Sequence, residues 1–183
     1  MKLYIFRHGE TFANVERMVQ DAHGSKAQLT RNGEAQAQKL RDELEAEKLP
    51  LVYVSPMDRA KRTGEIVAEA NKSKIVVLDD LREVDFGEAE NKHEDDIFEL
   101  YGKEFQAILD VPDLTTYDVR LPGGETKQEA LERFMEVLEF IKQDCRCDKA
   151  GVATHGHIMR LFYYHLYHVD HIFRNGEYFV IDI

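Results

Sequence analysis

The sequence predicts an α/β domain built on a mostly parallel sheet. Short apolar runs that favour strands alternate with longer stretches of helical periodicity, beginning with the run at residues 3–6. Two of these runs stop at a His-Gly pair and lead into a helix start. The last run, at residues 178–183, follows an Asn175-Gly176 turn, so we expect it at the sheet edge, antiparallel to the others.

Length and composition indicate one globular domain. The chain has 183 residues, of which 43% are hydrophobic and 32% are charged, as is usual for a folded protein with a single core. The net charge of −11 disfavours binding to nucleic acids or to anionic membranes, because both need a basic surface. An anionic small molecule would therefore need a local cluster of arginines.

The two cysteines and the apolar runs bear on the cellular compartment. Cys145 and Cys147 are too few and too close for a disulfide framework, and their sequence neighbours offer no further metal ligands. We expect both to be reduced thiols. The sequence has no transmembrane run, and a strand that starts at residue 3 leaves no room for a signal peptide. The expected location is the cytoplasm.

The first strand ends at Arg7-His8-Gly9, which places two functional side chains at the carboxyl edge of the sheet, where α/β sheets bind ligands. Imidazole can act as a nucleophile, guanidinium binds phosphoryl oxygens in pairs, and Gly9 permits close approach or a positive φ. An isolated Arg-His pair would be a surface turn. A second run that ends at Thr154-His155-Gly156, before another helix, favours a phosphate site instead, because a helix N-terminus attracts anions.

The elements between these motifs follow from periodicity and capping. Thr30 is the expected N-cap of a helix that runs to about Lys48. Ser55-Pro56-Met57-Asp58 predicts a second helix, to about Ala70, with Ser55 as N-cap. The inner side of the first helix should carry Ala35, Ala37, Leu40 and Leu44. Strands are expected at residues 51–54, 74–78 and 149–154, and a charged helix at 93–109.

A later helix begins with a capping box, Thr126-x-x-Glu129, and its apolar stripe predicts core packing. The stripe consists of Ala130, Phe134, Val137, Leu138 and Ile141.

These motifs, in this order along the chain, resemble those of branch 1 of the histidine phosphatase superfamily, the phosphoglycerate mutase-like proteins. The resemblance implies a three-layer α/β/α fold and a single domain over residues 1–183, with a small helical lid insertion at about 88–122. The matching residues are Arg7-His8-Gly9-Glu10-Thr11, Asn14, Leu29-Thr30 with Gly33, Ser55-Pro56-Met57-Asp58-Arg59-Ala60 with Thr63, Leu81-Arg82-Glu83 with Phe86-Gly87, Pro122-Gly123-Gly124-Glu125-Thr126, and Thr154-His155-Gly156.

The resemblance also implies roles for residues. The nucleophile would be His8, and the general acid would be Glu83, with Asp85 as its competitor. The remaining catalytic residues would be Arg7, Arg59 and His155, which bind phosphoryl oxygens. The expected substrate contacts are Asn14, Thr11, Gly156 and, three residues after Arg59, Arg62.

Two departures from the family pattern concern the substrate side. Gln20-Asp21 stands where relatives carry Gln-Gly or Thr-Gly, which removes support for a phosphate contact from that backbone. Glu88-Ala89-Glu90-Asn91 replaces a bulky aromatic residue followed by Glu-Gly, so the substrate-side wall is expected to be unusual.

The predicted function is a metal-independent phosphomonoesterase that forms a covalent phosphohistidine on a small phosphorylated metabolite, with no cofactor and no metal. Its expected partner is a small-molecule phosphate ester, not nucleic acid or membrane, and a homodimer is compatible with the sequence. Zinc binding by His165, His168 and His171 is a weaker alternative, since no fourth ligand is in register.

Three other functions stay open. One is mutase-type phosphoryl transfer, which is disfavoured because the chain ends at Ile183, soon after His155, without a tail to close the site. The second is a protein phosphohistidine phosphatase, whose resembled members lack the lid and the glutamate. The third is non-enzymatic, either a phosphate sensor or a partner-binding module on a phosphatase fold that has lost its activity, and it would not need the catalytic residues that are present here.

Overall fold

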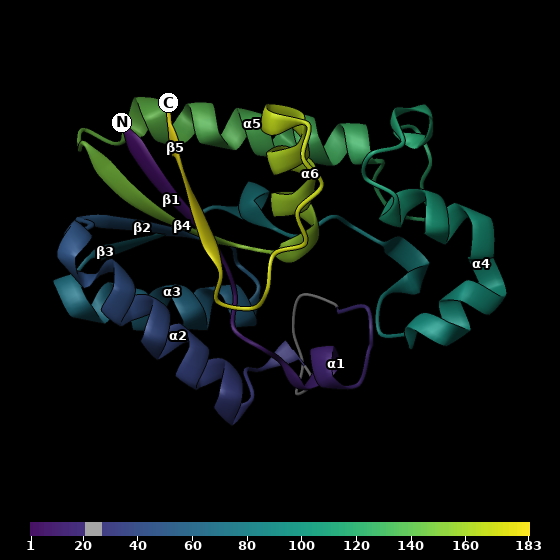
Figure 1. The fold of residues 1–183 in the computed structure, drawn as a ribbon, viewed down its shortest axis with the longest axis horizontal. Coiled ribbons are helices and arrows are strands. Elements are labelled where there is room, and N and C mark those ends of the chain that lie inside the picture. The colour runs from purple at the N-terminus through teal and green to yellow at the C-terminus, as the bar shows by residue number, and fades with distance from the viewer. Residues whose placement is uncertain (21–26) are drawn as a thin grey trace.

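The computed structural model describes residues 1–20 and 27–183 and has three layers (Figure 1). A central sheet is covered on one face by α2 (Arg31–Leu44) and α3 (Asp58–Asn71). The other face carries α5 (Lys127–Asp144) and α6 (Gly156–Tyr167). The predicted three-layer α/β/α fold is confirmed.

The sheet has the strand order β3-β2-β4-β1-β5. Its parallel pairs join β3 to β2, β2 to β4 and β4 to β1, whereas β5 runs antiparallel to β1 at the edge, as predicted. Arg7 on β1 lies opposite Thr154 on β4, so the two His-Gly motifs leave the sheet side by side. The strands are β1 (Lys2–Arg7), β2 (Leu51–Val54), β3 (Lys74–Val77), β4 (Lys149–Thr154) and β5 (Tyr178–Asp182).

Two hydrophobic clusters, one on each face, hold the layers together. The larger one lies beneath α5 and α6, and burial of its aliphatic and aromatic side chains is the main stabilising contribution. It contains the predicted stripe of α5, whose members are all buried: Ala130, Phe134, Val137, Leu138 and Ile141.

The helix starts agree with the predicted caps in two cases and differ in one. The Thr30 hydroxyl accepts from Gly33 N at 3.0 Å, and Thr126 and Glu129 form the predicted capping box of α5. α3, however, begins at Asp58 with Met57 as its N-cap, two residues after Ser55. The Ser55 hydroxyl has a different partner, described below.

Two details of α2 correct the prediction. The α-helix ends at Leu44, because residues 45–47 form a tighter 3-10 turn and Lys48 adopts a left-handed conformation with φ 52°. Ala35 faces solvent, and the buried side of the helix carries Ala37, Leu40 and Leu44 with Gly33. The glycine takes the place that Ala35 was expected to hold.

The segment at residues 88–122 contains α4 (Glu94–Leu109), which lies beyond the end of the sheet opposite the chain termini (Figure 1). Its backbone departs from helical geometry at Tyr101, with φ −131° and ψ 20°. The short helix α1 (Phe12–Val15) lies at the same end of the molecule. The carboxyl ends of the parallel strands therefore point toward the end of the molecule where α4 and α1 lie.

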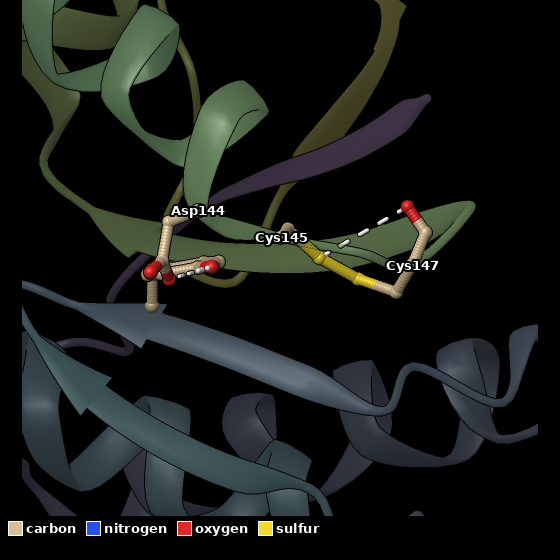
Figure 2. The surroundings of a disulfide bond; sticks show 4 residues. Asp144, Cys145 and Cys147 are labelled. Carbon is tan, nitrogen blue, oxygen red and sulfur yellow. Dashed lines mark hydrogen bonds between the residues drawn. A yellow bond between two sulfur atoms is a disulfide. The ribbon is translucent and has the colours of Figure 1, made fainter.

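The prediction of two reduced thiols is contradicted by a disulfide between Cys145 and Cys147 (Figure 2). Cys145 is the C-cap of α5, and its amide donates to the Ile141 carbonyl. The turn that follows brings the two Cα atoms to 5.3 Å, within the usual reach of a disulfide. Asp144, beside this bridge, accepts a hydrogen bond from the Tyr53 hydroxyl at 2.9 Å.

Among the described residues, none of the helices has the length and apolar character needed to cross a membrane.

Candidate active site

A cavity of about 300 Å³ lies at the carboxyl ends of the parallel strands. It is lined by five of the residues that the sequence singled out: Arg7, His8, Arg59, Glu83 and Gly156. They come from four separate parts of the chain, namely the ends of β1 and β4, the start of α3 and the loop after β3. The parallel sheet places them together because all these segments leave it at one edge.

His8 is buried, with 2% of its surface exposed. Its Nδ1 lies 2.7 Å from the Gly9 carbonyl, which only accepts, so Nδ1 carries the proton and Nε2 keeps its lone pair. Burial lowers the pKa of His8 well below its usual value, and the positive charges of Arg59 and Arg7 lower it further. The residue is therefore a neutral imidazole with a nucleophilic nitrogen.

His155 is fully buried at the N-cap of α6, and its ring centroid lies 5.3 Å from that of His8. Its Nε2 is 2.7 Å from the Ser55 hydroxyl. Burial, followed by the charge of Arg59, holds the pKa of His155 well below its usual value. Within residues 1–20 and 27–183, its buried Nδ1 has no hydrogen-bond partner. His155 is not among the described residues that line the cavity, so its contact with a phosphoryl oxygen stays a prediction.

The Arg7 side chain lies between the start of α6 and the segment that follows this helix. Its Nη1 donates to the Phe173 carbonyl at 2.6 Å, and its Nε is buried without a partner in the described part of the chain. A Cβ added at Gly156 would lie 2.8 Å from this Nε and 3.0 Å from Cζ. Only glycine at this position lets the guanidinium approach the start of α6.

Arg59, the second residue of α3, has only 1% of its surface exposed. Its Nη2 lies 3.1 Å from the Met57 sulfur. The Thr63 hydroxyl donates to the Arg59 carbonyl at 2.8 Å and accepts from the Gly9 amide at 3.1 Å, which fixes α3 against the turn after β1. The φ angle of Gly9 is not positive. Glycine is needed here because the backbone of Gly9 packs closely against the backbone of Gly33 on α2.

The Glu83 carboxylate caps the N-terminus of α6. It accepts from His157 N at 3.0 Å and from Ile158 N at 2.9 Å, where unpaired helix amides favour a negative charge. Arg133 supports the loop behind it by donating to the Asp80 carbonyl at 2.7 Å and to the Glu83 carbonyl at 3.2 Å.

Asp85, the competitor for the general acid, has its carboxylate turned toward the backbone of its own loop, where it accepts from Gly87 N at 2.8 Å. Unlike Glu83, it is not among the described residues that line the cavity. The geometry thus favours Glu83 for proton transfer.

Three predicted contacts are not brought to the cavity. Arg62 lies on an exposed part of α3, where Glu34 of α2 accepts two of its hydrogen bonds, at 2.8 and 2.9 Å. Thr11 and Asn14 cap α1, and the Asn14 side chain also accepts from Asn175. Neither lines the cavity within the described residues. The departure noted at Asp21 lies outside the described residues.

Sequence reasoning missed His157, which lines the cavity beside Glu83. Its ring packs against Phe86 with centroids 5.7 Å apart, and its Nε2 is buried without a partner among the described residues. Burial lowers the pKa of His157 to about 4, so it is neutral near pH 7. The only signal in the sequence was the repeated histidine of His155-Gly156-His157.

The three surface histidines do not gather in one place. His171 contacts Glu177 at 2.8 Å, whereas His165 and His168 line a separate surface hollow near Met135. In the described part of the chain, no three metal-binding side chains are grouped.

The rest of the cavity wall is mainly apolar. It combines side chains from the loop after α1, from the segment between β3 and α4, from α4 and from the segment after α6. These are Met18, Val19, Phe86, Phe105, Leu109, Ile172 and Phe173.

Comparison with known proteins identifies the family of the chain. The family model of the histidine phosphatase superfamily, branch 1, matches residues 3–175. The chain is 34% identical to a probable phosphoglycerate mutase, GpmB, of Klebsiella pneumoniae over 157 residues, which are 85% of this chain and 70% of that protein.

Solved structures show the same fold. YhfR of Bacillus stearothermophilus superposes with a TM-score of 0.88 at 28% identity, over 100% of this chain and 91% of that one. The alpha-ribazole phosphatase of Shigella flexneri gives a TM-score of 0.83 at 24% identity, over 100% and 91% of the two chains. Together with the family match over nearly the full length, these similarities establish that the chain belongs to branch 1 of the histidine phosphatase superfamily.

Proposed function

We propose that this protein is a metal-independent phosphomonoesterase that acts on a small phosphorylated metabolite through a phosphohistidine. The observation that carries the proposal is the state of His8. Its unprotonated Nε2, fixed by the Nδ1 contact with Gly9, belongs to a cavity that also holds the guanidinium groups of Arg7 and Arg59. Such an arrangement suits attack on a phosphorus atom whose oxygens are held by cations.

The first step would form a bond between His8 Nε2 and phosphorus while the bond from phosphorus to the ester oxygen breaks. Glu83, in its protonated form, would give its proton to the departing oxygen. Arg7, Arg59 and the Nδ1 of His155 would bind the three non-bridging oxygens, where negative charge has to be held. Because the arginines supply this charge, the step needs no metal.

In the second step, water would attack phosphorus and break its bond to His8. Glu83, now a carboxylate, would take the proton of that water and so return to its starting form. Glu83 Oε1 accepts from Val84 N and Ile158 N, whereas Oε2 accepts only from His157 N and keeps a lone pair for the proton, so Glu83 can stay at the N-terminus of α6 during both steps.

The charges around the cavity favour water, rather than a phosphoglycerate, as the molecule that accepts the phosphoryl group from His8. A phosphoglycerate carries a carboxylate besides its phosphate and needs a further cation. Arg160, which lines the cavity, is held by both oxygens of Asp170 at 2.5 and 2.7 Å. Arg17 pairs with Glu94 at 3.1 Å, and the Glu94 side chain itself lines the cavity.

Two further arginines, Arg82 and Arg120, are also paired with carboxylates. Arg82 contacts Asp80 at 3.2 Å, and Arg120 contacts Glu129 at 2.9 Å. The phosphatase names of several neighbours support the proposal, whereas the mutase name of the curated relatives supports the alternative.

The test is the hydrolysis of p-nitrophenyl phosphate in excess EDTA between about pH 5 and 8. We expect turnover by the wild-type protein and a loss of at least about 10⁴-fold in His8→Ala. His165→Ala, which removes an exposed imidazole of α6, is the matched control and should keep full activity. Equal activity of wild type and His8→Ala would refute the nucleophile. Interconversion of 2- and 3-phosphoglycerate without net hydrolysis would favour the mutase.

A further inference from the structure

A lysine is completely buried at the first position of α5, behind the cavity. Lys127 has 0% of its surface exposed, although lysine is among the residues least often buried. Its ammonium group donates to the Ala107 carbonyl at 2.9 Å, to the Asp110 carbonyl at 2.6 Å and to the Thr116 hydroxyl at 2.7 Å. The Asp113 carbonyl lies 3.4 Å from the same nitrogen, so four acceptors surround an ammonium group that has three hydrogens to donate.

The acceptors belong to the end of α4 and the turn after it. The last carbonyls of a helix have no partner within the helix, and the helix dipole makes this end negative. A buried cation at this point satisfies the carbonyls and is stabilised by them. The ring of Tyr117, with its centroid 4.8 Å from the Lys127 nitrogen, adds a cation–π contact.

This end of α4 is also part of the cavity wall. Phe105 and Leu109 line the cavity, and Ala107, whose carbonyl Lys127 holds, lies between them in the chain. The Leu109 carbonyl accepts from Arg160 of α6 at 2.8 Å. Two cations from the core helices therefore hold the carboxyl end of α4.

The amino end of α4 is joined to the loop after α1 by backbone hydrogen bonds, from Glu94 N to the Arg17 carbonyl at 2.9 Å and from Val19 N to the Lys92 carbonyl at 3.0 Å. The ion pair between Arg17 and Glu94 adds to these bonds, with side chains that are 59% and 40% exposed. Exposed pairs of this kind contribute little to stability. Between the two ends, the helix departs from regular geometry at Tyr101.

We propose that Lys127 is a positioning residue that fixes the α4 wall of the subsite in which the leaving group of the phosphate ester binds. Lys127 lies outside the cavity and touches no reacting atom. It acts through Ala107 and Asp110 on Phe105 and Leu109, which face the substrate side. The inference rests on the proposed function, because the subsite is that of the same reaction.

The test compares Lys127→Met with wild type. Methionine has a similar length and no charge, so it removes the hydrogen bonds that Lys127 donates to the Ala107 and Asp110 carbonyls. We expect the KM for p-nitrophenyl phosphate to rise at least about tenfold, while the inhibition constant of inorganic phosphate stays within about twofold. Inorganic phosphate has no leaving group and binds only to the arginine and histidine cluster. A change in KM without a change in the inhibition constant therefore locates the effect in the α4 wall and not in the phosphate site.

Thr116→Val is the second variant, because it removes one acceptor and keeps the ammonium. It should give a smaller rise in KM and tests the proposal if Lys127→Met does not fold. Lys149→Met is the matched control, since it removes a lysine paired with Glu47 at the opposite end of β4 and should leave both constants unchanged.

Hydrogen exchange gives a readout that does not depend on activity. Amides of residues 103–116 should exchange at least about tenfold faster in Lys127→Met, with little change along α5. An unchanged KM and unchanged exchange would overturn the proposal. An equal rise in KM and in the phosphate inhibition constant would also overturn it, because the damage would then reach the whole site. A wild-type protein without esterase activity would refute the proposed function, and exchange alone would then decide whether Lys127 positions α4.

Discussion

The two central imidazoles differ in the groups that orient them. His8 is fixed by the carbonyl of its own neighbour, Gly9, whereas His155 depends on the hydroxyl of Ser55, 100 residues away in the chain. A hydroxyl that donates to Nε2 would leave the proton of His155 on Nδ1, the atom that binds a phosphoryl oxygen in the proposed reaction. Ser55 would then set the tautomer of a residue that it does not adjoin in sequence.

We therefore expect Ser55→Ala to lower kcat/KM for p-nitrophenyl phosphate about tenfold, the size of one lost hydrogen bond that orients a ligand-binding group. Ser73→Ala is the control, because it removes a comparable bond, to the Leu49 carbonyl at 2.6 Å, away from the cavity. Both variants should lose a similar amount of thermal stability, and only Ser55→Ala should lose activity. Full activity of Ser55→Ala would show that the hydroxyl does not orient His155.

The contact between β1 and α6 depends on a glycine at the start of the helix. In Gly156→Ala the new methyl group would lie 2.8 Å from Arg7 Nε, so the guanidinium has to move away from α6. We expect the inhibition constant of inorganic phosphate to rise at least about tenfold, since Arg7 binds the phosphate in the proposed reaction. Inhibition assays on the folded variant check this.

Gly102→Ala provides the comparison, because a Cβ added there meets no described atom within 4 Å. It should keep the inhibition constant of wild type and gain about 0.5–1 kcal/mol from the higher helix propensity of alanine. If Gly156→Ala bound phosphate as wild type does, the close approach of Arg7 would not matter for binding.

Elements were predictable from sequence where their signals are local. Thr30 and Thr126 cap helices through contacts three residues away, and the stripe of α5 repeats at helical spacing. Ser55 carries a similar local signal, and its hydroxyl accepts from Met57 N at 3.3 Å, but the helix starts at Asp58. The same hydroxyl also contacts His155 of another element, a partner that no local pattern shows.

The same reasoning explains which site residues were found. His8, Arg59, Glu83 and Gly156 line one cavity because the topology brings the strand ends together. Arg62 has the spacing of a second phosphate ligand, but Glu34 of α2 binds its guanidinium.

Lys127 shows a different limit of sequence reasoning. Its position in the first turn of a charged helix is typical of a solvent-exposed lysine. Only the fold shows that its ammonium group donates to the Ala107 and Asp110 carbonyls. A residue whose partners lie in another element is visible only in three dimensions.

For the whole molecule, the buried histidines make stability depend on pH. His8, His155 and His157 all have a pKa lowered by burial, to about 4 for His157. In the unfolded chain each imidazole has its ordinary pKa of about 6.5. Below about pH 6.5 the unfolded chain therefore binds protons that the folded protein does not, and stability is lost as pH falls toward about 4.

Each of these imidazoles contributes a slope of up to about 1.4 kcal/mol per pH unit in this window, and the contribution is fully retained above about pH 7.5. Urea denaturation of wild type and His157→Gln at several pH values measures the effect. We expect the free energy of unfolding of His157→Gln to fall less steeply below about pH 6.5, by the equivalent of one proton. His165→Gln, which removes an exposed imidazole, should keep the slope of wild type. Equal slopes for wild type and His157→Gln would mean that His157 is protonated in the folded protein, which would contradict its burial as a neutral group beside Glu83.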